Sequence, residues 1–370
     1  MTDMPSVSVI MPIYNAEPFL RQALDSVLGQ TLDTIEIICV NDGSKDHSLD
    51  IMKDYASNDP RIKIIDKPNA GYGQTMNVGI SACSGEYIGI LEPDDYLKPS
   101  MYETLYKNAK AYDLDFVRSD YFRLTTDDSG IDHLQREPIC FKPEYYDKVL
   151  NPQENLDLFN IRMENWTGIF KRSWVEEHNI RFNESPGAGF QDNGFWFQSY
   201  CWATNIMVVN EGFYCYRVDN AASSINQTDK VFVMLDEYAW IEKWLRSNSE
   251  LYNKFIGVFH YKKTHNCEFA LSRLAPEFKL PFLKRYADEY NDAYNAGEID
   301  ESLFHEEELE RLKALLISPE CYLERCELQH DRNQRLNEAR SSGKFSLFRA
   351  YAREDGFISA LKRTLASIGK

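Results

Sequence analysis

The acidic cluster Glu92-Pro93-Asp94-Asp95 follows a short apolar run, Tyr87 to Leu91. A run of this length that ends near a proline is typical of a buried strand. In an open α/β sheet, carboxylates at the carboxyl end of a strand lie where the sheet binds its ligand. Neighbouring carboxylates repel one another unless a cation joins them, and Mg²⁺ or Mn²⁺ bridging to a diphosphate suits this position. The alternative is a solvated acidic turn, because Pro-Asp is a common turn pair.

Alternating strand-like and helix-like segments surround the cluster and favour the ligand site over the solvated turn. We expect strands at 7–13, 35–40, 62–65, 87–91 and 116–121, and helices at 17–28, 46–56, 74–83 and 99–111. Such alternation at short spacing predicts an α/β fold with a mostly parallel sheet and helices on both faces. Residues 125–143 are polar and irregular, as in a surface excursion. Residues 230–318 have a helical pattern and predict a helical C-terminal region.

Composition and charge narrow the function classes. The chain has 370 residues, with 41 Lys or Arg against 58 Asp or Glu, for a net charge of −17. This balance argues against a nucleic-acid partner, which needs a basic surface. No apolar run approaches the roughly 20 residues that span a bilayer, and the N-terminal residues lack the pattern of a signal peptide. The eight cysteines form no C-x-x-C pair, so we expect reduced thiols, no zinc site and a cytoplasmic protein.

The C-terminal tail differs from the rest of the chain in charge. Residues 340–370 contain seven basic and two acidic residues, a net charge of +5. Apolar residues at 357, 358, 361, 365 and 368 would share one face of a helix. A basic amphipathic helix can make a peripheral contact with an anionic membrane surface, here the inner face. It can equally dock onto the acidic body of its own chain or of a second subunit, and both interpretations stay open.

Three loops follow three of the expected strands and should meet at one edge of the sheet. They are Pro12 to Glu17, Asn41 to Ser44 and Glu92 to Asp95. A tyrosine can stack on a base, an aspartate can accept from the ring N–H of uracil, and an acidic pair can hold a metal on a diphosphate. These are the parts of a nucleotide-diphosphate site. Neither G-x-G-x-x-G nor G-x-x-x-x-G-K-[ST] is present, which removes the main signal for a dinucleotide or P-loop site.

Four motifs occur in the order in which family 2 of the glycosyltransferases has them. They are Ser8-Val9-Ile10-Met11-Pro12-Ile13-Tyr14-Asn15, Ile38-Cys39-Val40-Asn41-Asp42-Gly43-Ser44, Asn69-Ala70-Gly71 with Met76-Asn77-Val78-Gly79, and Leu91-Glu92-Pro93-Asp94-Asp95. The chain therefore resembles that family over about residues 6–122. The resemblance implies the GT-A fold, a UDP-sugar as donor, a divalent metal (Mn or Mg) as cofactor, and transfer with inversion.

The resemblance also implies a donor site. In it, Tyr14 and Asp42 would hold the base, and Asp94 and Asp95 would hold the ribose, the diphosphate and the metal. The full implied donor set is Pro12, Tyr14, Asn15, Glu17, Asp42, Asn69, Gly71, Asn77, Asp94 and Arg217, with Asp94 and Asp95 as metal ligands. Arg217 follows a tyrosine and precedes a serine pair, as in the family, and could neutralise the leaving diphosphate. The alternative for Arg217 is a surface ion pair.

Two positions depart from the family pattern. Glu92 stands where the family usually has the first aspartate of its acidic motif. Its longer side chain could reach a metal through water, or it could contact only the residues that hold the metal. Met76 stands where many members have an arginine, which removes one possible contact to the diphosphate. We therefore place more weight on Asp94 and Asp95, without choosing between them as the direct ligand.

An inverting transfer needs a carboxylate that takes the proton of the acceptor hydroxyl. The family has this base at an acidic pair that opens a helix, and Pro186 to Asn193 matches that element, with Gln191 where Glu is commoner. Asp192 is therefore the expected base. The alternative is a helix N-cap, and both roles can hold together because a helix N-terminus stabilises an anion. We expect Trp166, Phe190 and Gln191 to contact the acceptor.

The predicted organisation has a nucleotide-sugar half at 1–122, an acceptor half at 123–229, a helical domain at 230–330 and the basic tail at 331–370. The predicted function is an inverting glycosyltransferase that acts on a glycan or a lipid-linked acceptor in bacterial-type surface-glycan synthesis. One alternative is a nucleotidyltransferase, although the chain lacks its glycine-rich basic loop after the first strand. The other is a catalytically inactive nucleotide- or glycan-binding module, which the departures at Glu92 and Gln191 keep open.

Overall fold

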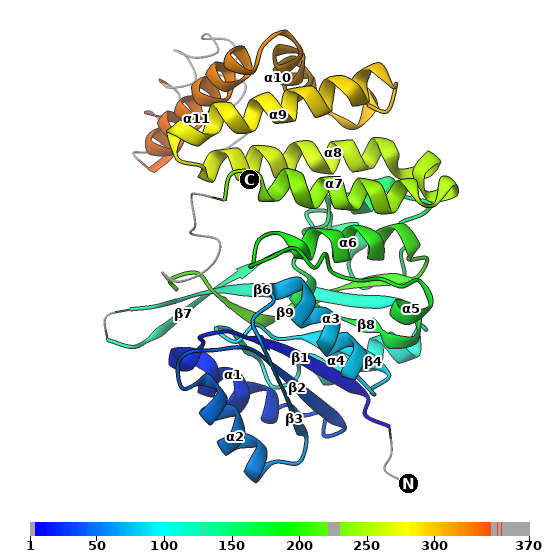
Figure 1. Cartoon of the computed structure of the whole chain (residues 1–370), viewed down its shortest axis with the longest axis vertical. Helices are drawn as coiled ribbons and strands as arrows, with labels where there is room; N and C mark the ends of the chain where they lie inside the picture. Colours follow the sequence, from blue (N-terminus) through cyan, green and yellow to red (C-terminus); the bar gives the residue numbers. More distant parts are fainter. Residues whose placement is uncertain (1–3, 128, 221–229, 342–345, 347–348, 350–370) are drawn as a thin grey trace. The chain divides into compact units, whose positions relative to one another are not determined.

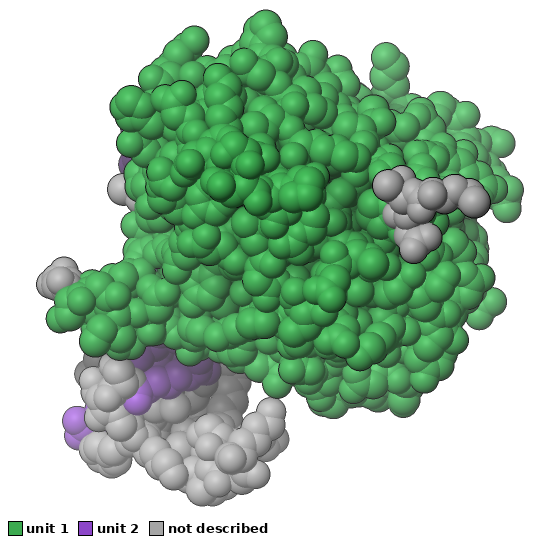
Figure 2. All heavy atoms as spheres, turned by 90° about the horizontal axis from the view of Figure 1, so that it is seen from below, with its two compact units in different colours: residues 1–270 green, residues 271–370 purple. Residues whose placement is uncertain are grey.

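The structure is a computed structural model that describes residues 4–127, 129–220, 230–341, 346 and 349 (Figure 1). The chain divides into two compact units, Met1–Ala270 and Leu271–Lys370 (Figure 2). The finer divisions expected near residues 122, 229 and 330 stay predictions. Most of the basic tail, including every apolar position of its expected helical face, lies outside the described residues.

In the described part of the chain, nine strands form one sheet in the order β3-β2-β1-β4-β8-β6-β9-β5, with β7 paired to β6. The strands are β1 (Val7–Ile13), β2 (Ile35–Asp42), β3 (Ile62–Lys67), β4 (Tyr87–Ile90), β5 (Tyr96–Leu97), β6 (Phe116–Thr126), β7 (Asp132–Glu137), β8 (Gly168–Lys171) and β9 (Ile206–Arg217). The sheet is parallel from β3 through β2 and β1 to β4. Beyond β4 it is mixed, because β8 pairs antiparallel with both β4 and β6, whereas β6 and β9 are parallel.

Helices cover both faces of the parallel half, as expected. The α-helices of the first unit are α1 (Glu17–Leu28), α2 (Ser48–Asn58), α3 (Tyr72–Ala82), α4 (Met101–Ala111), α5 (Arg172–Glu177), α6 (Gln191–Trp202), α7 (Val233–Arg246) and most of α8 (Ser249–Arg273). The chain moves one way along the sheet through α1 and α2 and returns through α3, so right-handed crossovers put α3 on the opposite face (Figure 1). Covered on both sides, β1, β2 and β4 are buried along their whole length.

The expectation for residues 125–143 was partly wrong. Strand β6 continues to Thr126, and β7 returns beside it as an antiparallel hairpin partner from Asp132 to Glu137. The side chains of β7 are mostly polar and largely exposed. The segment therefore lacks the apolar alternation by which a half-buried strand is predicted, and its strand character comes from pairing with β6.

The second unit is helical in its described part, as expected. It contains the end of α8, followed by α9 (Pro276–Asn295), α10 (Glu306–Ile317) and α11 (Pro319–Ser341). Among the residues that the structure describes, no helix has both the length and the apolar character needed to cross a membrane. All eight cysteines are free thiols, and six of them are buried.

Candidate active site

The loops after β1 and β2 are tied together by hydrogen bonds. Asn15, with φ of +50°, donates its backbone N–H to Ser44 Oγ (3.1 Å) and accepts at Oδ1 from the N–H of Lys45 (2.7 Å). The Glu17 carboxylate accepts from the N–H of His47 (3.1 Å). Both side chains are therefore used to join the two loops. Their expected contact with the donor stays a prediction, and their evident effect is to position the residues around them.

Tyr14 directly follows the last residue of β1. Its side chain is 50% exposed, whereas Pro12 is buried within the strand. No ring contact occupies Tyr14 among the described residues, so its face is open to a planar base. Pro12 shapes the strand end that precedes Tyr14, and its expected contact with the donor stays a prediction.

Asp42 is the last residue of β2 and gathers the glycine-rich loop around its carboxylate. The carboxylate accepts from the N–H groups of Ala70 (2.9 Å) and Gly71 (3.1 Å) and forms an ion pair with Lys67. Asn69 donates its side-chain amide to the Asp42 carbonyl (3.0 Å). A carboxylate offers about four lone-pair positions, so these three contacts leave room for one further donor, such as a base N–H.

Gly71 lies against the loop that precedes α6. It has φ of +92°, and a Cβ there would lie 2.8 Å from the backbone nitrogen and oxygen of Gly187. The neighbouring Tyr72 donates its N–H to the Gly187 carbonyl (2.8 Å). The glycine-rich loop expected to hold the donor therefore contacts the loop that leads to Asp192.

The two aspartates of the acidic cluster differ in their surroundings. Asp95 is 1% exposed and accepts from the hydroxyl of Tyr214 (2.8 Å) and the N–H of Arg217 (2.7 Å). Burial, followed by the charge of Asp94, raises the pKa of Asp95 well above its usual range. Asp94 is partly exposed and accepts from the side-chain amide of Asn220 (2.9 Å), its one side-chain partner among the described residues. Asp95 thus anchors the acidic cluster to β9, and Asp94 has one carboxylate oxygen without a side-chain partner among the described residues.

Glu92 is the third carboxyl group of the cluster, and its Oε1 accepts from the hydroxyl of Tyr72 (2.7 Å). Burial raises the pKa of Glu92 to about 8; the hydrogen bond from Tyr72 opposes the shift, and the charges of Asp94 and Asp192 add to it. Asp192 also contributes to the raised pKa of Tyr72. Asp192 at the start of α6 therefore lies close enough to the acidic cluster for its charge to act on Glu92 and Tyr72.

Asp192 occupies the first turn of α6, directly after Phe190 and Gln191. Burial raises the pKa of Asp192 to about 6, and the charge of Glu164 adds to this shift. Hydrogen bonds from the backbone N–H groups of Asp192 and Asn193 oppose it. No ion pair joins Asp192 to a basic residue within the described ranges. Its carboxylate is therefore unneutralised, mostly deprotonated at neutral pH and able to accept a proton.

The three residues expected to contact the acceptor differ in exposure. Gln191 is 1% exposed, and its amide accepts from Gly189 N–H (2.6 Å) and donates to Ser185 Oγ (3.0 Å), so it shapes the loop before α6. Phe190 is partly exposed and adopts φ of +65°. Trp166 is also partly exposed and stacks on Tyr216, with ring centroids 5.1 Å apart. Acceptor contact stays a prediction for all three, and the geometry leaves Trp166 and Phe190 the better candidates.

Arg217 is 6% exposed and bonded to several elements. Its guanidinium donates to the backbone oxygen of Asp94 (3.0 Å), to Thr126 Oγ1 (2.8 Å) and to Gln22 Oε1 (2.7 Å). It also forms an ion pair with Asp219 (3.7 Å). Arg217 therefore holds the acidic cluster against β6 and α1, and the ion pair considered above is present, although the arginine that makes it is buried rather than at the surface. The contact of Arg217 with a diphosphate stays a prediction. The serine pair at 223–224 lies outside the described residues.

Asn77 lies on α3, and all of its amide contacts are within the protein. Its Nδ2 donates to the Phe182 carbonyl (2.9 Å) and to Glu184 Oε1 (2.9 Å), and its Oδ1 accepts from Phe182 N–H (3.0 Å). The amide thus attaches residues 182–184 to α3. The expected contact of Asn77 with the donor stays a prediction that these hydrogen bonds do not support.

Two tyrosines were missed in the analysis of the sequence. Tyr72 binds Glu92, and Tyr214 both binds Asp95 and accepts from the N–H of Glu92 (3.0 Å). Tyr214 could have been predicted from its spacing. Alternate residues of a strand share a face, and Tyr214 lies two positions before Tyr216, the tyrosine that precedes the expected donor residue Arg217. Tyr72 directly follows the expected donor glycine, but nothing in its sequence context indicated a carboxylate partner.

Comparisons with known proteins identify the family of the chain. A sequence model described as "Glycosyl transferase family 2" matches residues 8–174. "Uncharacterized glycosyltransferase EpsJ" of Bacillus subtilis (strain 168) is 31% identical over 282 residues, which are 75% of this chain and 77% of that protein. The chain belongs to glycosyltransferase family 2. A second relative in the family, "Putative glycosyltransferase EpsH" of the same organism, is 32% identical over 267 residues, 69% of this chain and 74% of that protein.

Solved structures confirm the fold class. S. aureus TarS 1–349 superimposes with a TM-score of 0.61 at 17% identity, covering 88% of this chain and 91% of that one. The same protein in complex with UDP-GlcNAc gives a TM-score of 0.63 at 16% identity, covering 88% and 92%. The sheet with its flanking helices and helical C-terminal region is therefore of the GT-A type, as predicted. Membership of family 2 makes the chain a glycosyltransferase, in preference to a nucleotidyltransferase or an inactive binding module.

Proposed function

We propose that this glycosyltransferase moves a sugar from a UDP-sugar to a hydroxyl group of a glycan or lipid-linked acceptor, with inversion at the anomeric carbon. The observation that carries the proposal is that Asp192 lies near the acidic cluster: the loop before α6 contacts Gly71 and Tyr72, and the charge of Asp192 acts on both Glu92 and Tyr72. A base and a diphosphate site must adjoin in this way for a single displacement. The structural similarity to TarS, which has been solved with UDP-GlcNAc, supports a UDP-sugar as donor.

A divalent ion, Mn²⁺ or Mg²⁺, fits the chemistry of the cluster. Within the described residues, no three His, Cys, Asp or Glu side chains form a ready ligand set. Mg²⁺ sites that involve nucleotides, however, usually need only one or two carboxylates, because the phosphates and water supply the other oxygens. Asp94 offers such a carboxylate. Its negative charge contributes to the raised pKa of both Glu92 and Asp95. When bound, the ion would offset the charge of the departing diphosphate.

Other side chains would bind the base, support the acidic cluster and accept the proton. Tyr14 stacks on the uracil ring, and the fourth lone-pair position of Asp42 accepts its N–H. Asp95, through Tyr214 and Arg217, keeps the acidic cluster in register with β9. Asp192 takes the proton from the acceptor hydroxyl while that oxygen attacks the sugar carbon and the bond to the diphosphate breaks.

The acceptor and the cellular location remain part of the proposal. We expect synthesis of a bacterial-type surface glycan on the cytoplasmic side of the membrane. Contact of residues 340–370 with an anionic membrane stays a prediction, since most of that segment lies outside the described residues.

Incubation of the protein with a panel of UDP-sugars and Mn²⁺, without acceptor, tests the proposed donor. We expect slow release of UDP from one sugar nucleotide, because water can replace the acceptor at a formed site. The same panel in excess chelator is the control. Release of UDP from none of the sugars, or equal release in chelator, would contradict the proposed donor chemistry.

Asp42→Ala should weaken UDP more than CDP. Uracil has a ring N–H where cytosine has a bare acceptor nitrogen, so only UDP loses a bond to a charged acceptor. Such bonds contribute about 1.5–3 kcal/mol, which predicts a loss of roughly 10- to 100-fold for UDP by calorimetry. Lys67→Met is the matched control, because it loosens the same loop without touching the base and should affect both nucleotides alike. Equal losses for UDP and CDP in Asp42→Ala would remove Asp42 from the base pocket.

A further inference from the structure

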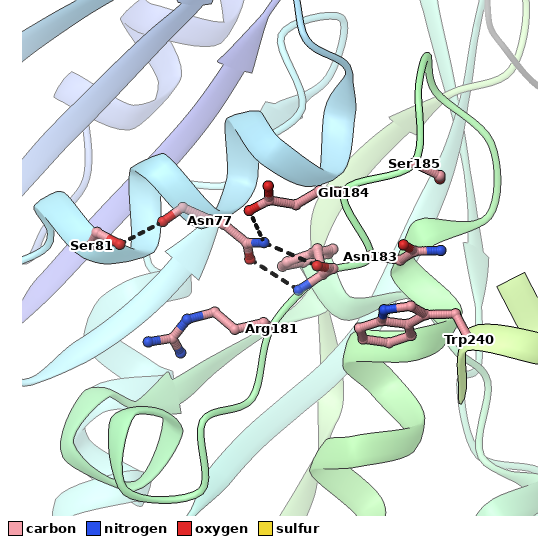
Figure 3. Close-up of a pocket in the computed structure, with 8 residues that line it drawn as sticks. Asn77, Ser81, Arg181, Asn183, Glu184, Ser185 and Trp240 are labelled. Atoms are coloured by element: carbon pink, nitrogen blue, oxygen red, sulfur yellow. Dashed lines mark hydrogen bonds between the residues drawn. The ribbon is translucent and has the colours of Figure 1, made fainter. Parts of the chain in front are cut away.

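An open pocket of about 580 Å³ lies in the first unit, between α3, the segment 181–185 and α7 (Figure 3). Figure 3 shows Asn77 and Ser81 of α3 on one side and the indole of Trp240 on the other. This volume is within the range of small-molecule sites. The lining residues lie outside the loops after β1, β2 and β4. Of their side chains only that of Asn77 belongs to the expected donor set, and its amide is bonded to Phe182 and Glu184.

The charged groups of the pocket are not paired with each other. Arg181 donates from Nη1 to the carbonyl of Ile180 (2.8 Å), and Glu184 accepts at Oε1 from Asn77 (2.9 Å). Neither side chain forms an ion pair with another residue of the described ranges. An anion would be repelled by Glu184 and a cation by Arg181. A neutral ligand with several hydroxyl groups can accept from the guanidinium and donate to the carboxylate at the same time.

The other lining groups suit the same kind of ligand. Asn183 and Ser185 add an amide and a hydroxyl, both partly exposed. The Asn183 amide nitrogen donates to Glu237 (2.8 Å) and the Ser185 oxygen accepts from Gln191 (3.0 Å), so the amide oxygen and the hydroxyl hydrogen are the atoms that a ligand could bind. Trp240 is partly exposed, and no other aromatic ring in the described part of the chain contacts it. A Cβ at Gly194 of α6 would lie 2.7 Å from its ring, so the indole is held closely against that helix. An aromatic face with hydroxyl-binding groups around it matches a pyranose, whose C–H face is apolar and whose rim is polar.

We propose that this pocket binds a neutral sugar unit of the acceptor glycan, remote from the hydroxyl that reacts. The inference rests on the proposed function, because it assigns an acceptor to the same enzyme. Glu184 and Asp192 are eight residues apart, and a fully extended chain of that length spans at most about 29 Å. Hydrogen bonds hold this segment at both ends. Near its start, the Asn77 amide bonds to Phe182 and Glu184, and near its end, the Gln191 amide bonds back to Ser185. An oligosaccharide with its end at Asp192 can therefore reach the pocket.

Fluorine NMR of the full chain labelled with 5-fluorotryptophan tests this pocket without any donor. The probes are maltose, cellobiose and N,N′-diacetylchitobiose at millimolar concentrations, with glucuronate and glucosamine as charged comparators. We expect the resonance that Trp240→Phe removes to shift in a saturable way with at least one neutral disaccharide, and to respond less to the charged sugars. No shift of that resonance with any neutral disaccharide would overturn the proposal.

Single substitutions test whether the charged side chains of the pocket bind the sugar or only lie near it. Glu184→Gln and Arg181→Gln should each weaken the sugar about tenfold or more, because each removes a charged hydrogen-bonding group. Trp244→Phe is the matched control on α7, since Trp244 packs edge-on against Phe197 and does not line the pocket. Unchanged affinity in both pocket variants would overturn the assignment of these residues.

Donor hydrolysis distinguishes failure of this proposal from failure of the proposed function. Arg181→Gln should release UDP from the donor at the wild-type rate, because Arg181 lies outside the donor loops. Wild-type hydrolysis with no sugar bound near Trp240 would reject the sugar pocket alone. Absence of hydrolysis in the wild-type protein would reject the proposed transferase chemistry, while the NMR titration would still report on the pocket.

Discussion

Asp192→Asn should lower the rate of sugar transfer by at least about 100-fold and leave UDP binding near that of the wild type. General base catalysis typically contributes roughly 10²–10⁴-fold. Asparagine keeps the shape of the side chain and suits the first turn of a helix, but it cannot accept a proton at neutral pH. Asp192 lies on α6, apart from the nucleotide loops after β1 and β2, so its loss should spare the donor.

Transfer rates and UDP calorimetry on the same preparation check this result, and the pH profile adds an independent readout. The pKa of Asp192 is about 6, so kcat/KM of the wild type should rise with pH through that value as the base loses its proton. Glu164→Gln removes a negative charge that raises this pKa, and should therefore move the acid limb to lower pH. A variant of Asp192 that retains most of the transfer rate would leave this residue with a structural role only.

Asp94→Asn should abolish the metal-dependent binding of UDP. Wild-type protein should be stabilised by UDP with Mn²⁺ by about 2.7 kcal/mol at a hundredfold excess over the dissociation constant, seen as a rise in melting temperature. In the variant, the diphosphate meets a site that has lost its best carboxylate for the cation, so most of that rise should disappear. If UDP stabilises the wild type equally well in chelator, the metal assignment fails.

Asp95→Asn is the matched control, one residue away in the same motif. Its carboxylate is buried and receives hydrogen bonds from Tyr214 and Arg217. An amide nitrogen in its place cannot accept, and leaving a buried donor unsatisfied costs about 1–3 kcal/mol. We expect this variant to melt at a lower temperature without ligand, whereas Asp94→Asn should not. The same behaviour in both variants would contradict the division of roles between the two aspartates.

The sequence by itself determined the family, the fold class and much of the parallel half. Strand β1 and helix α1 have the predicted bounds, because their apolar residues follow the periods of a buried strand and of an amphipathic helix. The predicted strands placed the three loops that are expected to bind the donor at the carboxyl ends of β1, β2 and β4, where the structure has them. Strand β7 escaped prediction because its polar, exposed side chains carry no such period, and only pairing with β6 makes it a strand.

Only the tertiary structure decided which polar groups of the site are free. The sequence presents Asp94 and Asp95 as equals, but the partners that occupy Asp95 come from β9, more than a hundred residues away. Arg217, Asn77 and Gln191 were expected at the ligands, which stays a prediction, and the structure shows that their side chains also bond to other parts of the protein. A carboxylate, amide or guanidinium has the same appearance in a sequence whether its hydrogen bonds are made or open. Whether they are made depends on donors and acceptors that folding alone brings within reach.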